Sequence, residues 1–210
     1  SVYNYVSASR LTGKGALLTT STAGENTGYF SDTVWQTNDG MNSRGVFSSS
    51  TSTISWFFKR APGFFDVVAY SGNSTAGRTV SHNLGVKPEL MIVKARSGAT
   101  NQSWFVYNSN DTATDYMLLN GTDASDPAST VWNNTEPTSS VFTVGLSTFT
   151  NASGYEYIAY LFATLDGISK VGTYSGAGSS NVDVDCGFSA GARFVMIKRT
   201  DSSGGWYVFD

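Results

Sequence analysis

The sequence has few charged residues and almost no cysteine or histidine. Of its 210 residues, 13 are Lys or Arg and 16 are Asp or Glu. Charged residues therefore make up 14% of the chain, against about 25% in a typical soluble domain. So few scattered basic residues do not form the positive surface that a nucleic-acid backbone requires, and we expect no nucleic-acid partner. The single cysteine, Cys186, excludes a fold held together by intrachain disulfides.

Long apolar runs are also missing. The longest, residues 158–163, is far shorter than the roughly 20 residues of a membrane-spanning helix, so we expect no membrane association. The chain starts at Ser1 without the basic and apolar regions of a signal peptide, and we expect a processed product or a segment of a longer protein. Disorder is excluded, because 13 Phe, 11 Tyr and 5 Trp can build a core.

What the sequence has instead is 30 Ser, 24 Thr, 14 Asn and 22 Gly. These residues disfavour helices, whereas Thr and aromatic residues favour strands, and Asn and Gly favour tight turns. Short β-branched and aromatic runs lie between Gly, Asn, Ser or Pro clusters, at residues 67–70, 90–93, 141–144, 157–163 and 194–197. We therefore predict an all-β fold, an antiparallel β-sandwich or a jelly-roll-like arrangement, without helices. Successive apolar positions in two runs predict strands covered on both faces.

Internal similarity is the strongest signal in the sequence. Three segments recur in the same order, the first two at an offset of 104 residues: 65–73 (FDVVAYSGN) and 169–177 (SKVGTYSGA), 89–94 (ELMIVK) and 193–198 (RFVMIK), 104–108 (WFVYN) and 206–210 (WYVFD). Four further pairs match with more drift: 17–18 and 118–119, 33–35 and 130–132, 46–47 and 141–142, 55–58 (SWFF) and 159–162 (AYLF).

These matches predict two tandem repeats of about 100 residues. One division of the chain gives domains at residues 1–105 and 106–210. In the alternative, residues 63–166 form one complete domain. The half-units before and after it then belong with each other or with neighbouring material.

Residues capable of catalysis or metal binding are sparse. His82 is the only histidine, and the repeat places Cys186 at its position, so we expect a structural or surface role. Asp183 and Asp185 would share one face of a strand and could hold Ca²⁺, but a solvated face is the favoured interpretation. Among the acids, Glu156 lies in a strand-like run without a matching acid in the other repeat. We therefore predict no catalytic residues, no metal and no cofactor.

Several aromatic residues are retained in both repeats. Trp104 matches Trp206, Tyr70 matches Tyr174, and Trp35 matches Trp132. Exposed Trp and Tyr rings stack on sugars, which makes Trp104, Trp206, Tyr70 and Tyr174 candidate carbohydrate-binding residues. The alternative, favoured for residues retained within one chain, is that all six form the shared core.

Three motifs carry a resemblance to a known family: residues 66–73 (DVVAYSGN), 82–94 (HNLGVKPELMIVK) and 197–208 (IKRTDSSGGWYV). With the stretch at 132–142, they resemble an uncharacterised domain of tailed-phage virion proteins, especially those of marine phages that infect cyanobacteria and other aquatic bacteria. The second repeat departs from the pattern at Ala192, where the first has Pro88. The resemblance implies a fibre, spike or surface-decoration component and supplies no catalytic residues.

We therefore expect a structural and adhesive virion protein of a tail fibre, tail tip or head fibre, exposed on the particle surface. Its expected partners are further copies of itself, other virion proteins and a host surface glycan. One alternative is a carbohydrate-binding module for bacterial surface polysaccharide, and a less favoured one is a segment of a polysaccharide depolymerase.

Overall fold

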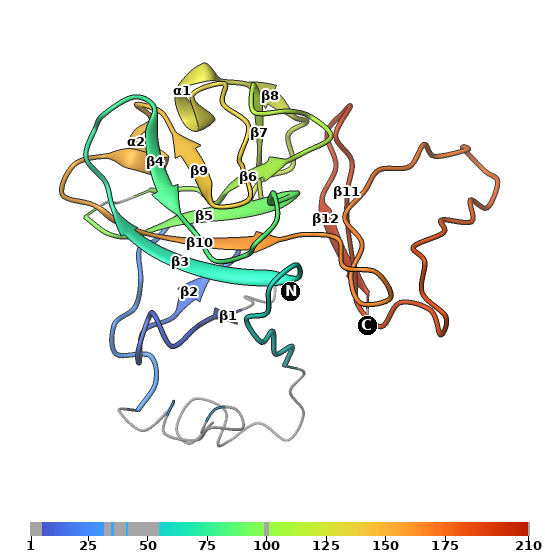
Figure 1. Ribbon diagram of the computed structural model, residues 1–210, viewed down its shortest axis with the longest axis horizontal. Helices are drawn as coiled ribbons and strands as arrows, with labels where there is room; N and C mark the ends of the chain where they lie inside the picture. Colours follow the sequence, from blue (N-terminus) through green and yellow to red (C-terminus); the bar gives the residue numbers. More distant parts are fainter. Residues whose placement is uncertain (1–5, 32–34, 36–40, 42–54, 99–100, 210) are drawn as a thin grey trace.

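The computed structural model of the chain describes residues 6–31, 35, 41, 55–98 and 101–209. Within these residues the strands pair antiparallel, in one large sheet and three two-stranded sheets (Figure 1). This confirms the predicted all-β fold with antiparallel sheets.

The large sheet has six strands. In order across the sheet they are β3 (Phe65–Ser71), β10 (Glu156–Phe162), β5 (Leu90–Ser97), β6 (Phe105–Asn108), β7 (Asp115–Leu118) and β8 (Asp126–Pro127). Strand β10 therefore lies between β3 and β5, which both come much earlier in the sequence. It pairs with β3 from Glu156↔Ser71 to Phe162↔Phe65 and with β5 along its other edge.

The two central strands β5 and β10 are buried on both faces, as their successive apolar residues predict. Alternate side chains of a strand point to opposite faces. In β10, Tyr157, Ala159 and Leu161 enter one apolar cluster, whereas Ile158, Tyr160 and Phe162 belong to a second cluster on the other face. The sheet thus has a core on each side.

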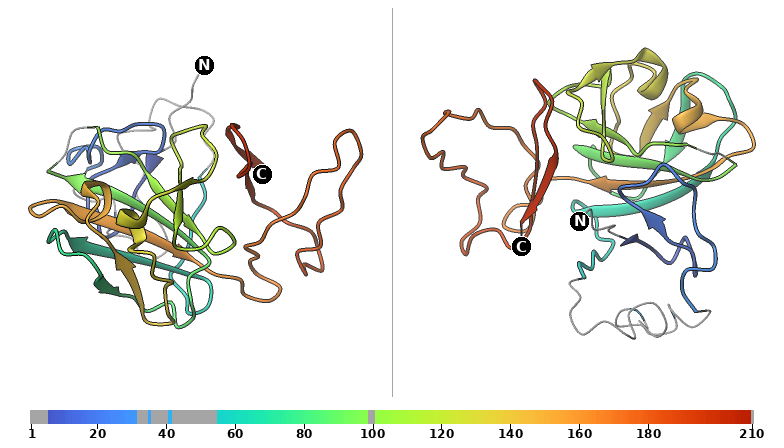
Figure 2. Two further views of the ribbon diagram at one scale, coloured as in Figure 1. Left: turned by 90° about the horizontal axis from the view of Figure 1, so that it is seen from above. Right: turned by 180° about the vertical axis from the view of Figure 1, so that it is seen from behind.

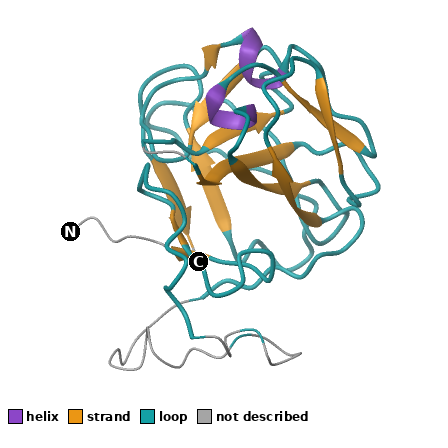
Figure 3. Cartoon of the chain, turned by 90° about the vertical axis from the view of Figure 1, so that its left-hand side faces the viewer, coloured by secondary structure: helices purple, strands orange, loops and turns teal. Residues whose placement is uncertain are grey.

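One face of the sheet is covered by a second β layer. The pair β4 (Arg78–Ser81) and β9 (Val141–Val144) lies there, with the helical turns α1 (Ser129–Trp132) and α2 (Thr148–Asn151) (Figures 1 and 3). Phe142 and Trp132 from this layer are fully buried against the sheet. The sheet and this layer form the sandwich.

The other face is covered by both ends of the described chain. The pair β1 (Val6–Ser7) and β2 (Leu17–Leu18) packs there through Leu17, and the hairpin β11 (Val195–Lys198) with β12 (Trp206–Phe209) packs through Met196 and Trp206. The connection from β10 to β11 leaves the sheet after residue 169 and extends away from it (Figure 2). An open groove remains between the sheet and these end segments.

Two local expectations are wrong: the absence of helices and the placement of Asp183 and Asp185 on a strand. The stretches 129–132 and 148–151 form helical turns, the second begun by the Ser147 hydroxyl, which accepts a hydrogen bond from the Phe149 N–H. Residues 170–177, which match part of β3 in sequence, have no regular structure, and Asp183 and Asp185 lie in a loop rather than on a strand. A strand needs a partner to satisfy its backbone, and the described residues provide none for these two segments.

Candidate functional site

The groove side of the sheet contains a buried lysine and tryptophan. Lys94 of β5 has no exposed surface, and its Nζ donates to the carbonyl oxygens of Thr22, at 3.2 Å, and Gln102. The Trp104 ring centroid lies 5.9 Å from the same Nζ, and the Trp104 Nε1–H donates to the Leu18 carbonyl at 3.1 Å. These contacts bond the β5–β6 hairpin to strand β2 and the loop that follows it. We call this set of contacts the first junction.

A second set of contacts joins the β11–β12 hairpin to strand β7. Lys198 Nζ donates to the carbonyls of Thr122 at 3.3 Å and Asp123 at 2.8 Å, and also to those of Arg199 and Gly204, both at 2.9 Å. Trp206 Nε1–H donates to the Leu118 carbonyl at 2.9 Å. We call this set the second junction.

The donors of the two junctions match in the sequence repeat, Lys94 with Lys198 and Trp104 with Trp206. In each, a lysine that follows four apolar residues binds carbonyls of a Thr-containing loop, and a tryptophan at the start of the next strand binds a leucine carbonyl. The backbone N–H two residues before each tryptophan also donates to a threonine carbonyl, from Gln102 to Thr22 at 2.9 Å and from Gly204 to Thr122 at 2.8 Å. The chain therefore makes the same contact twice.

Burial sets the protonation of the two lysines. Desolvation lowers the pKa of Lys94 to about 8. Lys198 is only partly buried: desolvation lowers its pKa as well, and the nearby Asp123 opposes the shift. A buried ammonium is tolerated where carbonyl oxygens replace its water, so each lysine depends on the backbone of the opposing loop.

The structure separates the four candidate carbohydrate-binding residues. Trp104 is 1% exposed, Trp206 is half-buried, and both line the groove together with Tyr174, which is 49% exposed. Tyr70 lies on the opposite face, where it is buried, stacks on Tyr157 at 5.2 Å and donates its hydroxyl to the Thr150 carbonyl. Burial raises the pKa of Tyr70 well above its usual value. Of the four, Tyr174 and Trp206 keep surface open to a ligand.

His82 lies directly after β4 and is buried. Its Nδ1 accepts from the Leu84 N–H, and its Nε2 lies 3.2 Å from the Thr138 carbonyl and donates to it. Burial lowers its pKa, which favours the neutral ring that these two bonds require. Both nitrogens are thus used to hold the turn at residues 82–84.

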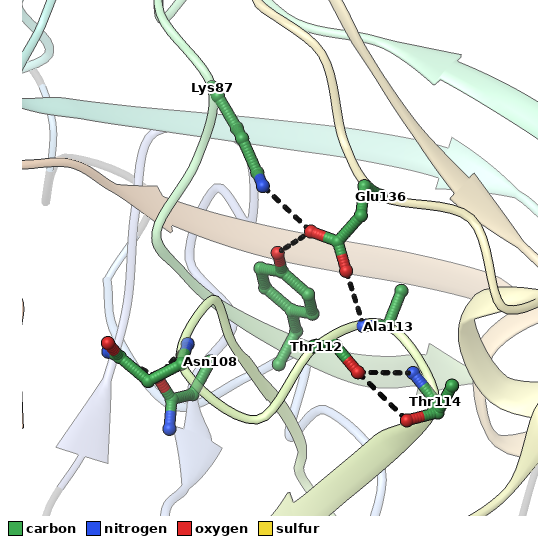
Figure 4. Close-up of polar contacts among 8 residues, drawn as sticks. Lys87, Asn108, Thr112, Ala113, Thr114 and Glu136 are labelled. Atoms are coloured by element: carbon green, nitrogen blue, oxygen red, sulfur yellow. Dashed lines mark hydrogen bonds and ion pairs between the residues drawn. The ribbon is translucent and has the colours of Figure 1, made fainter.

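Glu136 is the centre of a polar network on the sandwich side (Figure 4). Its carboxylate accepts from Lys87 Nζ at 2.8 Å, from the Tyr107 hydroxyl at 2.6 Å and from the Ala113 N–H at 2.6 Å. Burial alone would raise the pKa of Glu136, but these donors lower it. The carboxylate is therefore ionised and links these loops. Burial of Tyr107 and its hydrogen bond to Glu136 raise the pKa of the Tyr107 hydroxyl.

Two further carboxylates, those of Asp66 and Glu25, also make hydrogen bonds or ion pairs within the fold. Buried Asp66 accepts from Arg60 Nε at 2.5 Å and from the backbone N–H groups of Val67 and Asn83. Glu25 pairs with Arg96 at 2.5 Å. Glu156 opens β10 and is exposed. Among the described residues, no three or more His, Cys, Asp or Glu side chains gather where they could share a metal ion.

The lysines of the junctions are the residues that sequence reasoning missed. Each lysine follows an apolar run, and the two runs match in the repeat. The match alone predicts a shared strand and does not indicate that its lysine is buried. The available signal was a lysine following four apolar residues within a strand covered on both faces.

The comparisons with known proteins identify a family but no function. The chain belongs to the family called domain of unknown function DUF7483, whose model matches residues 7–210. No curated protein and no solved structure matches the chain. In the described part of the chain, neither helical turn has the length or hydrophobicity to span a bilayer.

The buried state of Lys94 predicts a pH-dependent stability. Between about pH 8 and pH 10 the unfolded chain keeps the lysine proton and the folded chain releases it, so the free energy of unfolding should rise with pH, by up to about 1.4 kcal/mol per unit. Lys94→Met should lack this rise. Urea unfolding at several pH values over that range measures both slopes.

Lys198→Met is the matched control, because Lys198 is more exposed and its substitution should change the slope less. Parallel curves for Lys94→Met and the unaltered protein would contradict a buried ammonium at Lys94.

Proposed function

We propose that the chain is a structural and adhesive protein built from tandem β units, acting as part of a virion fibre, tail tip or head decoration. The observation that carries the proposal is the recurrence of the lysine–tryptophan junction, with the same donors and the same kind of carbonyl acceptors. Repeat proteins are held together by one contact used again between successive units. The role is not enzymatic.

The hairpins that carry the two junctions also have equivalent strand registers. The pairs Met91↔Tyr107, Ile92↔Val106 and Val93↔Phe105 correspond in the sequence repeat to Val195↔Phe209, Met196↔Val208 and Ile197↔Tyr207. A shift of one residue would turn every side chain to the other face, so the shared register supports a common unit.

The surface of the C-terminal hairpin supports association with further protein. Tyr207 and Phe209 are 60% and 58% exposed, and the chain as a whole has few charged residues. Exposed aromatic residues of this size favour contact with another surface. We therefore include further copies of the chain and other virion proteins among its partners.

A second candidate function is recognition of a surface polysaccharide in the groove. Tyr174, Trp206 and Tyr207 line this groove and keep part of their rings accessible. Aromatic rings with adjacent hydroxyl and amide groups are suited to sugar rings.

The second junction can be tested by hydrogen exchange. In Lys198→Met the amides of β11 and β12 should exchange about tenfold faster, as expected for loss of about 1.4 kcal/mol of charge-assisted bonding, whereas those of β3 and β10 should not change. The control is Lys170→Met, an exposed lysine of the same C-terminal segment. Unchanged exchange in the hairpin would remove the junction as the basis of the proposal.

The location can be tested on particles. Gold-labelled antibody against the purified chain should decorate the tail or head of virions produced from the genome that encodes it. Virions that carry neither label nor the chain by mass spectrometry would overturn the virion assignment.

Polysaccharide binding can be tested by calorimetric titration with host surface polysaccharide. Tyr174→Ala should weaken binding about tenfold or more without changing the unfolding midpoint, because the side chain is largely exposed. Leu146→Ala alters an exposed residue outside the groove and should bind as the unaltered chain does. Equal binding by both variants would argue against the groove as the sugar site.

A further inference from the structure

The hairpin β11–β12 has an open edge that is filled in the equivalent part of the large sheet. Strand β5 pairs with β6 on one side and with β10 on the other. Its sequence counterpart β11 pairs with β12 in the equivalent register, and within the described residues no strand lies along its other edge. An open strand edge exposes unpaired N–H and C=O groups and readily accepts another strand.

The sequence repeat identifies a strand for this edge. Residues 55–58 (SWFF) match residues 159–162 of β10 at an offset of 104, and Phe194 matches Leu90 at the same offset. Because Phe162 lies opposite Leu90, the repeat predicts that Phe58 lies opposite Phe194.

The structure places these residues together. The Phe58 ring centroid lies 6.0 Å from that of Phe194, in an edge-to-face arrangement, and the Trp56 ring lies 5.5 Å from Phe194. In an antiparallel pair, contact with the directly opposite residue and with the residue two positions along is expected on one face. Residues 55–58 are already at the end of β11 where such pairing would begin.

We infer that residues 55–58 add to the open edge of β11 as an antiparallel strand, with Phe58 opposite Phe194, Phe57 opposite Val195 and Trp56 opposite Met196. The two ends of this chain thereby build a second unit, in which residues 55–58 take the position that β10 has in the first. This inference rests on the proposed function, because it assumes that the chain is made of tandem units.

The two junctions support a second unit made from both ends. In the first junction, Trp104 of the large sheet bonds to Leu18 of the N-terminal part; in the second, Trp206 of the C-terminal part bonds to Leu118 of the large sheet. If the N-terminal and C-terminal parts form one unit, each unit donates its tryptophan to a leucine carbonyl of the other. Such reciprocal contacts are typical of a two-fold related pair.

The positions of the two ends agree with this pairing. Leu17 from the N-terminal part and Met196 and Trp206 from the C-terminal part pack in one apolar cluster on the same face of the large sheet. Trp56, Phe57 and Phe58 line the groove between these segments, and Phe57 is 64% exposed. Strand pairing would cover the apolar side chains of residues 55–58.

An engineered disulfide tests the register. The variant Phe57→Cys, Val195→Cys, made with Cys186→Ser, should form a disulfide within one chain under oxidised glutathione, because directly opposite residues meet the Cα separation limit of about 7 Å. The register control, Phe57→Cys, Ile197→Cys with Cys186→Ser, places the second cysteine two residues further along β11. It should form the intrachain bond at least about tenfold more slowly.

Peptide mapping and non-reducing electrophoresis separate the outcomes. An intrachain bond between positions 57 and 195 supports the inference. A bond between two chains would show that a second copy fills the edge, and equal or absent bonding in the two variants would show that the strand does not pair; either result overturns it.

Residue-resolved amide exchange on the unaltered chain provides a measurement that does not depend on a variant folding. A strand paired on both edges protects successive amides, whereas a strand paired on one edge protects alternate ones. Protection of all four residues of β11 supports the inference, and alternate protection overturns it. If Lys198→Met loosens the hairpin while β11 shows alternate protection, the strand pairing fails and the tandem-unit proposal stands.

Discussion

The pairing of β10 with β3 on one edge and β5 on the other is the constraint on which the rest of the structure depends. It joins strands far apart in the sequence into one sheet and fixes the faces to which their side chains point. Tyr157 and Leu161 thereby enter the core beneath the second β layer, while Ile158 and Tyr160 enter the cluster on the groove side of the sheet. The junction residues Lys94 and Trp104 lie on the groove side because the same register places them there.

Much of the fold could be predicted from the sequence, because local composition and periodicity determine where strands form. The apolar runs that became β3, β5, β9, β10 and β11 are bounded by turn residues that end each strand. Local sequence does not determine whether a strand finds a neighbouring strand to pair with. The sequence of residues 170–177 matches part of β3, but a strand also requires a neighbour, and within the described chain these residues have none. The helical turns at α1 and α2 follow from connections packed over the sheet, which local propensity does not encode.

The candidate site could be predicted only in part. Repeat matching selected Trp104 and Trp206, but their indole N–H groups bond to leucine carbonyls of segments remote in sequence, and no local pattern indicates such a partner. Lys94 illustrates the same limit: a lysine within a strand is normally read as solvent-exposed, and its burial depends on where the loop around Thr22 lies. Tyr70 and Tyr174 match in the repeat yet differ in burial, because only Tyr70 has the second β layer above it.

The late position of β10 in the chain also has a consequence for synthesis. During translation β3 and β5 leave the ribosome more than fifty residues before the strand that lies between them, and the sheet cannot close until residue 162 has emerged. Contacts of such long sequence separation slow folding, and strands waiting for a partner expose edges that can pair with a neighbouring nascent chain. The sparse charge of this sequence gives little electrostatic protection in that interval. Slow elongation after β5 would therefore favour misassembly, and fast elongation would favour the native sheet.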